Sequence, residues 1–148
     1  MFGSFFEGGL GDFANKLYET IAPLSSPLVE FEALLKRGDL YTANQMINRS
    51  ENPLDIHNPD ASGVYAIHAA CRAGSFEMVQ TLLSSNAPLL VTDHEGNTTL
   101  HYAAMGPSLD IVKFMVSQGA DVSALNKNGQ SSYDVATLHV IRGYLLPL

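Results

Sequence analysis

The sequence predicts an all-α solenoid, a stack of short antiparallel helix pairs joined by β-turn fingers. The main reason is that several residues recur at an interval of 33. They are Gly63, Gly96 and Gly129, then Ala70, Ala103 and Ala136, and His68 with His101. Within each period the apolar residues follow two short helical patterns. Each helix is shorter than the roughly 12 residues at which an isolated helix becomes marginally stable in water, so neighbouring units must stabilise one another.

The first 26 residues lie outside the repeat and form an N-terminal segment with helical spacing. Its apolar residues follow one another at intervals of three or four: Phe2, Phe6, Leu10, Phe13, Leu17, Ile21 and Leu24. This spacing predicts an amphipathic helix over Asp12 to Ile21. The glycines before Asp12 oppose an earlier start, because each costs about 1 kcal/mol relative to alanine in a helix.

Three roles stay open for this N-terminal segment. It can cap the edge of the first repeat, dock into a partner protein or a second copy of the chain, or attach to a membrane surface. The docking stripe would consist of Phe2, Phe5, Phe6, Leu10, Phe13 and Leu17. Membrane attachment is the least favoured role because Glu7, Asp12 and Glu19 outnumber Lys16, whereas anionic lipids attract cations.

A degenerate first repeat is expected over residues 27–62. Its apolar residues align with those of the next repeat at an offset of 36, so about three extra residues lie in the loop after Glu51. The aligned residues are Phe31, Leu34, Leu35, Gly38, Leu40, Ala43, Met46 and Ile47. The end unit of a solenoid needs a polar outer face, and this repeat can supply one because it carries Glu30, Glu32, Lys36 and Arg37.

Two complete repeats follow, over residues 63–95 and 96–128. Four-residue turn sequences that end in glycine mark the repeat boundaries: Asp60 to Gly63, Asp93 to Gly96 and Asn126 to Gly129. This composition is typical of β-turns. Thr98 is expected to cap the helix that follows it, with Tyr65 and Ser131 at the equivalent positions. Asn86 and Gly119 tolerate a left-handed backbone and mark the end of the second helix.

A fourth repeat starts at residue 129 and runs to residue 148 without being completed. Tyr133 and Asp134 take the places of the leucine and the histidine, and Val140 replaces the glycine between the helices. The chain reaches an apolar end, Tyr144 to Leu148, that lacks the polar outer face of an end repeat. This feature favours a chain that is part of a longer polypeptide.

These repeats closely resemble ankyrin repeats. The segment Gly96-Asn-Thr-Thr-Leu-His-Tyr-Ala-Ala104 is similar to the Gly-x-Thr-Pro-Leu-His-x-Ala-Ala stretch of that family, with Thr99 in place of proline. The segment Gly63-Val-Tyr-Ala-Ile-His-Ala-Ala-Cys71 matches more loosely. The resemblance covers Pro27 to Leu148, about four repeats, and implies an ankyrin-repeat solenoid in which the histidine hydrogen-bonds into the neighbouring turn.

The resemblance also implies where a protein partner would bind. In ankyrin-like stacks the finger tips and the exposed positions of the first helices form a concave strip. Transferred position by position, this strip consists of Ala61, Ser62, Val64, Arg72, His94, Glu95, Asn97, Met105, Lys127, Asn128, Gln130 and Leu138. Arg72, Met105 and Leu138 recur at intervals of 33 and combine a cation with two apolar side chains, a mixture found at interface centres. Alternatively, Met105 and Leu138 only cover the core.

Composition excludes several classes of protein. The 148 residues are 46% hydrophobic, enough for one folded domain. The 15 acidic and 8 basic residues give a net charge of −7, and the basic residues are scattered along the sequence, so no nucleic-acid partner is expected. The single cysteine suits the cytoplasm, with the nucleus as the alternative. The sequence has neither a signal-peptide pattern nor an apolar run near the ~18 residues of a membrane span.

No catalytic centre, metal site or cofactor is expected. His68 and His101 lie on successive repeats, about 10 Å apart, which is too far for both to bind one metal ion. The loop histidines His57, His94 and His139 lack cysteines or carboxylates at ligand spacing. Cys71 occupies a position that requires a small residue, so we expect a buried and unreactive thiol.

The predicted function is therefore a non-catalytic protein-protein interaction module, a scaffold or adaptor that holds a protein or peptide. Three alternatives remain. The chain can be a regulatory or targeting domain of a larger polypeptide, a peripheral membrane adaptor that uses its Phe-rich N-terminal segment, or a scaffold that self-associates through the same segment.

Overall fold

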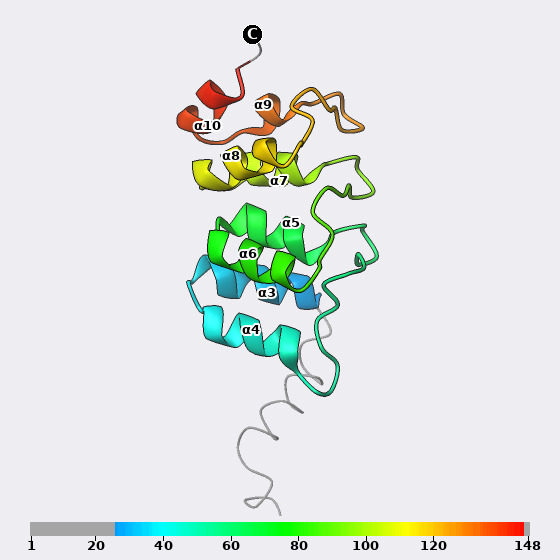
Figure 1. Ribbon diagram of the computed structural model, residues 1–148. Coiled ribbons are helices and arrows are strands. Elements are labelled where there is room, and N and C mark those ends of the chain that lie inside the picture. Colours follow the sequence, from blue (N-terminus) through cyan, green and yellow to red (C-terminus); the bar gives the residue numbers. More distant parts are fainter. Residues whose placement is uncertain (1–25, 147–148) are drawn as a thin grey trace, which may run out of the picture.

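The computed structural model describes residues 26–146, which contain eight helices arranged as four pairs. The pairs are α3 (Pro27–Lys36) with α4 (Leu40–Asn48), α5 (Ala66–Ala73) with α6 (Phe76–Ser84), α7 (Thr99–Met105) with α8 (Leu109–Ser117), and α9 (Ser132–Val135) with α10 (His139–Tyr144). They stack in chain order, and their connecting fingers lie along one side (Figure 1). The described residues contain no β-strand, only an isolated bridge between Thr92 and Thr98. The predicted all-α solenoid is confirmed.

The first helices of the pairs form the spine of the stack. Helix α3 packs against α5, α5 against α7, and α7 against α9. Where α5 and α7 meet, Ala70 and Ala103 are completely buried, and so are the larger Ile67 and Leu100. Alanine has the highest helix propensity and a small side chain, so it supports these short helices and also lets them approach closely.

The second helices cover the spine and carry the polar outer surface. In α6, Val79 and Leu82 are completely buried, whereas Glu77 is exposed. Burial of each such side chain contributes roughly 1.5–3 kcal/mol, so the amphipathic stripe holds the helix in place. The predicted left-handed residues stand one residue beyond the C-caps of α6 and α8, with φ of 61° at Asn86 and 92° at Gly119.

Side-chain caps were predicted at the start of α5, α7 and α9, and the structure has them at α7 and α9. The hydroxyls of Thr98 and Ser131 accept hydrogen bonds from the amide three residues further on, at 3.2 and 3.3 Å. Tyr65 makes no side-chain cap. Instead, its own amide donates to Nδ1 of His68 at 3.2 Å. The amide of His68, which a capping hydroxyl would accept, donates to the carbonyl of Tyr65 at 3.0 Å.

The fourth pair is shorter than predicted, because α9 has only four residues. The backbone becomes extended at Ala136. The amide of Thr137 then donates to the carbonyl of Ala104, and its hydroxyl to the carbonyl of Met105, both at 3.3 Å. These bonds tie the chain to the end of α7. The expectation that Leu138 extends the first-helix series was therefore wrong: Leu138 precedes α10 and is 40% exposed.

The N-terminal segment lies outside the described residues. This holds for the expected helix over Asp12 to Ile21 and for the docking stripe of Phe2, Phe5, Phe6, Leu10, Phe13 and Leu17. Between residues 26 and 146, no helix is both long enough and apolar enough to cross a lipid bilayer.

Candidate protein-binding surface

Each finger is a tight turn closed by its first side chain. In the first finger, Oδ1 of Asp60 accepts hydrogen bonds from the amides of Ser62 and Val64 at 2.8 and 3.0 Å. Gly63 has φ of 79°, the left-handed region that side chains disfavour, and its amide donates to the carbonyl of Asp60 at 3.0 Å. Asp93 and Asn126 close the next two fingers in the same way. The predicted turns are thus confirmed.

Hydrogen bonds between neighbouring fingers join them into one strip. The amide of His94 donates to the carbonyl of Ser62 at 3.1 Å, and the amide of Lys127 donates to the carbonyl of Glu95 at 2.9 Å. The packing is tightest at Gly63, where a Cβ would lie 2.7 Å from the amide nitrogen of His94. The positions of the finger tips are therefore fixed relative to one another.

The proposed contact residues fall into two groups in the structure. Eight are exposed: Ala61, Ser62, His94, Glu95, Lys127, Asn128, Gln130 and Leu138. Four are half-buried: Val64, Arg72, Asn97 and Met105. All except Leu138 lie on fingers or on the last turn of α5 and α7. We call the fingers and these two helix ends the finger face.

His68 and His101 connect the helices to the next finger. Each Nδ1 accepts the amide at the start of its own helix, at 3.2 and 3.1 Å, so Nε2 carries the proton. Nε2 of His68 donates to the carbonyl of Val91 at 3.0 Å, and Nε2 of His101 to the carbonyl of Gln130 at 2.8 Å. Burial lowers the pKa of His68. The contact into the neighbouring turn implied by the resemblance is thus present.

The described residues contain no metal-binding cluster, and the cysteine among them is buried. No group of three histidine, cysteine or carboxylate side chains lies close enough to hold a metal ion between residues 26 and 146. Cys71 is completely buried, and burial raises the pKa of its thiol. A buried neutral thiol packs as a small apolar group, as predicted.

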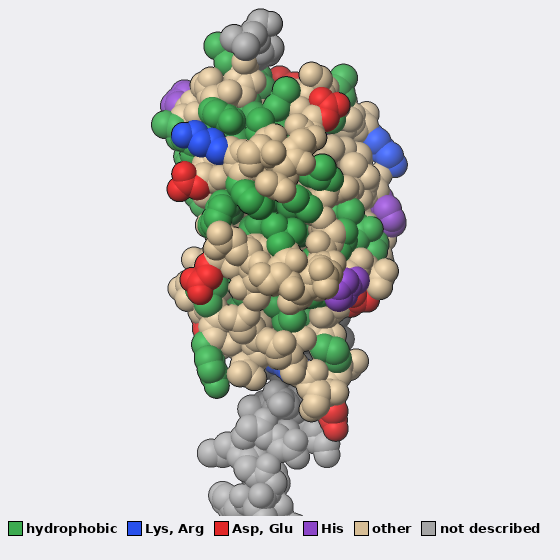
Figure 2. Space-filling model, in the orientation of Figure 1, with side chains coloured by type: hydrophobic (Ala, Val, Ile, Leu, Met, Phe, Trp, Pro, Cys, Tyr) green, Lys and Arg blue, Asp and Glu red, His purple; other side chains and the backbone are tan. Residues whose placement is uncertain are grey.

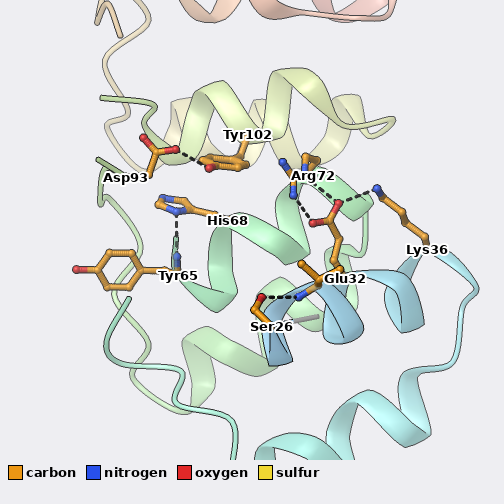
Figure 3. A network of polar contacts seen from close by, with 9 residues as sticks. Ser26, Glu32, Lys36, Tyr65, His68, Arg72, Asp93 and Tyr102 are labelled. Atoms are coloured by element: carbon orange, nitrogen blue, oxygen red, sulfur yellow. Dashed lines mark hydrogen bonds and ion pairs between the residues drawn. The ribbon is translucent and has the colours of Figure 1, made fainter. Parts of the chain in front are cut away.

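Arg72 joins three consecutive repeats (Figure 3). Its Nε donates to Oε1 of Glu32 at 2.8 Å, and its Nη2 bonds the other carboxylate oxygen, which makes a bidentate pair between α5 and α3. Nζ of Lys36 lies 2.7 Å from Oε1 of the same carboxylate. On the other side, the guanidinium lies over the ring of Tyr102 in α7, 5.4 Å from its centroid.

The expectation that Glu32 lies on a polar outer face was wrong: the residue is only 6% exposed. Burial alone would raise its pKa, but the hydrogen bonds from Arg72 and Lys36 outweigh burial and lower it. Glu32 therefore stays ionised at neutral pH. The burial of Glu32 could have been predicted from the sequence, because the offset of 36 aligns Glu32 with His68, which is a buried position of the repeat.

Tyr102 extends this network from Arg72 to the second finger. Its hydroxyl donates to Oδ2 of Asp93 at 2.5 Å. The ring of His68 stacks on the ring of Tyr102, with centroids 4.4 Å apart and an interplanar angle of 10°. Burial would raise the pKa of Asp93, yet the hydrogen bonds from Tyr102 and Asn97 lower it. Tyr102 therefore both holds the carboxylate that closes the finger and supports the guanidinium of Arg72.

Comparisons with known proteins identify these repeats. The family described as "Ankyrin repeats (3 copies)" matches residues 31–126. Protein phosphatase 1 regulatory subunit 27 of Mus musculus is 33% identical over 101 residues, which cover 68% of this chain and 64% of that protein. Protein phosphatase 1 regulatory subunit 12A of Mus musculus is 34% identical over 120 residues, 79% of this chain and 11% of that protein.

A relative of another class contains similar repeats. Palmitoyltransferase AKR1 of Naumovozyma castellii is 32% identical over 115 residues, 77% of this chain and 15% of that protein. The chain spans less than two thirds of the length of each of these relatives, so the likeness concerns their repeats. On the matched residues and the stacked helix pairs, the chain belongs to the ankyrin-repeat family.

Proposed function

We propose that this chain is a non-catalytic module that binds a partner protein through its finger face. The observation that carries this proposal is the continuous finger strip. Backbone hydrogen bonds of 3.1 and 2.9 Å fix the three fingers to one another, while the side chains at their tips, such as Glu95 and Lys127, are exposed. A surface that is already ordered loses little conformational entropy on binding, which favours affinity.

The finer proposal is that binding regulates the partner. Two relatives are named as regulatory subunits of protein phosphatase 1, and they match this chain over 68% and 79% of its length. These names support a regulatory role and make the catalytic subunit of protein phosphatase 1 the first partner to test.

The test compares the finger face with the outer second helices. The full chain is immobilised and exposed first to purified protein phosphatase 1 catalytic subunit and then to a cell lysate, with bound proteins identified by mass spectrometry. One variant carries Ala61→Glu and Asn128→Glu at two finger tips. The matched control carries Gln45→Glu and Gln80→Glu, which add the same charge at exposed positions of α4 and α6.

The finger-tip variant should lose the captured partner, and the control should retain it. All four positions are exposed, so thermal unfolding should change little in either variant. Equal capture by both variants would contradict the assigned face. Capture of other proteins but not of the phosphatase subunit would refute that partner while leaving the binding function in place.

A further inference from the structure

We infer that the adjacent ends of α3 and α5 form a basic subsite that receives an acidic residue of the partner, with an apolar residue of the partner packed beside it on Met105. This inference rests on the proposed function and specifies the chemistry of the partner. The subsite consists of Lys36 and Arg72, and Glu32 is the residue that positions them.

Folding brings these basic residues together although they are scattered along the sequence. Lys36 is the last residue of α3, Arg72 lies in the last turn of α5, and the two helices pack side by side. Arg37 follows Lys36 directly, but the ion pairs of Glu32 are with Lys36 and Arg72, so Arg37 is not counted in the subsite. On the face drawn in Figure 2, by contrast, the basic side chains stand apart from one another.

Two cations share one carboxylate in this cluster, which leaves hydrogen-bonding capacity for another anion. Glu32 is almost fully buried, whereas the side chains of Lys36 and Arg72 are 56% and 40% exposed. Arginine has five N–H groups and lysine three, and Glu32 takes only some of them. A carboxylate from a partner would complete the cluster with two cations between two anions.

Nη1 of Arg72 is the guanidinium nitrogen that makes no hydrogen bond to Glu32. No hydrogen-bond acceptor in residues 26–146 contacts it, since Nε and Nη2 make the bonds to Glu32. The single buried side-chain polar atom without a partner in that range is Oγ of Ser132. Because the Arg72 side chain is 40% exposed, an incoming acceptor can reach the part of the guanidinium that Glu32 leaves unbound.

Arg72 is oriented before any partner arrives. The bidentate pair with Glu32 fixes its plane, and the ring of Tyr102 supports its face from 5.4 Å. An arginine held in this way loses little rotamer freedom on binding, and its planar geometry selects acceptors by direction. The arrangement thus favours a carboxylate at a defined position over diffuse attraction of negative charge.

Met105 supplies the apolar neighbour. A Cβ on Gly106 would lie 2.5 Å from the carbonyl oxygen of Cys71 and 2.9 Å from that of Arg72, so the end of α7 lies directly against the end of α5. Met105 immediately precedes Gly106 and is partly exposed. Methionine adapts its shape to apolar groups at binding surfaces. The partner segment should therefore carry Asp or Glu near an aliphatic or aromatic residue.

The first test selects peptides without assuming a partner. A phage library of random 12-residue peptides is panned on the full chain, on Arg72→Gln and on Arg49→Gln. Arg49 is an exposed arginine at the end of α4, so its substitution removes the same charge elsewhere. The wild type and Arg49→Gln should enrich peptides with an acidic residue close to an apolar one, and Arg72→Gln should lose the acidic preference.

The second test measures affinity with the most enriched peptide, labelled with fluorescein, by fluorescence anisotropy. Arg72→Gln should weaken binding about tenfold, the lower end of the range for a hydrogen bond to a charged group, and Arg49→Gln less than about twofold. Replacing the acidic residue of the peptide with glutamine should weaken binding to the wild type about tenfold but hardly change binding to Arg72→Gln. The comparison of the two peptides on the wild-type protein does not involve Arg72→Gln. This part of the test therefore stands even where that substitution reduces stability.

The remaining outcomes separate the two proposals. Enriched peptides without an acidic preference, whose binding is lost in the variant with Ala61→Glu and Asn128→Glu, would overturn the basic subsite and keep the finger face as a binding surface. Failure to enrich any peptide would count against both. A fluorescein-labelled 20-nucleotide single-stranded RNA should not bind; RNA binding that depends on Arg72 would assign these cations to phosphates and overturn the inference.

Discussion

A graded series of glycine-to-alanine substitutions would test whether the fingers support one another. Gly63, Gly96 and Gly129 occupy the same position in successive fingers and have nearly equal φ angles of 79°, 77° and 73°. Their surroundings differ. A Cβ at Gly63 would lie 2.7 Å from the amide nitrogen of His94, one at Gly96 would lie 3.2 Å from the amide nitrogen of Lys127, and one at Gly129 would meet nothing within 4 Å.

The expected losses of stability follow from these distances. Every substitution incurs the cost of a left-handed backbone for a residue with a Cβ, about 1–2 kcal/mol, and Gly129→Ala should show this cost alone. Gly63→Ala must also displace the backbone of the next finger. That displacement adds roughly 1–3 kcal/mol of overpacking and weakens the 3.1 Å bond from His94 to Ser62, so we expect about 2 kcal/mol more than for Gly129→Ala. Gly96→Ala should fall between the two.

Urea unfolding followed by far-UV circular dichroism would measure these differences. The three variants share one chemical change and one backbone conformation, so Gly129→Ala serves as the internal control for the other two. The order of destabilisation should be Gly63, then Gly96, then Gly129. Equal losses at all three positions would refute the conclusion that packing between fingers fixes the binding strip.

Three further measurements address the interior. His101→Ala removes a buried ring bonded to its own helix and to the next finger, and should lower the free energy of unfolding by about 3 kcal/mol in urea; a loss below about 1 kcal/mol would contradict the structural role. Cys71 should react with a thiol reagent only after unfolding, because it is completely buried and burial raises its pKa; reaction of the native protein at the rate of a free thiol would contradict this. The folded protein lowers the pKa of Glu32, so the stability gained from its ionised form is present above the unfolded pKa, about 4.3, and is lost as pH falls through the lowered value. The urea midpoint should therefore drop less between about pH 5 and about pH 3 in Glu32→Gln than in the wild type, and parallel profiles would count against the ionised pair.

The repeat and its turns could be predicted from the sequence because their determinants are local. A left-handed position requires glycine or asparagine within a few residues of a turn, so Gly63 and Asn86 reveal the backbone conformation that they adopt. The helix pairs follow from apolar spacing within 33 residues. These signals repeat in phase, so each supports the others.

The charged network could not be derived in the same way, because its members are far apart in the sequence. Glu32 and Arg72 are separated by 40 positions, and no short motif records their pairing. Charge alone indicated an exposed residue at Glu32. Only the alignment with His68, together with a basic residue on the facing helix, reveals a buried ion pair. The early end of α9 was missed for a similar reason, since it depends on contacts of Thr137 with the preceding repeat.

The central claim is that a partner binds the finger face and leaves the outer second helices free. Hydrogen–deuterium exchange of the full chain, alone and with the captured partner or the selected peptide, tests this claim most directly. Exchange should slow in the finger residues 60–65, 93–98 and 126–131 and at the ends of α5 and α7, and stay unchanged in α4, α6 and α8. Protection confined to α4, α6 and α8, with no change in the fingers, would contradict it.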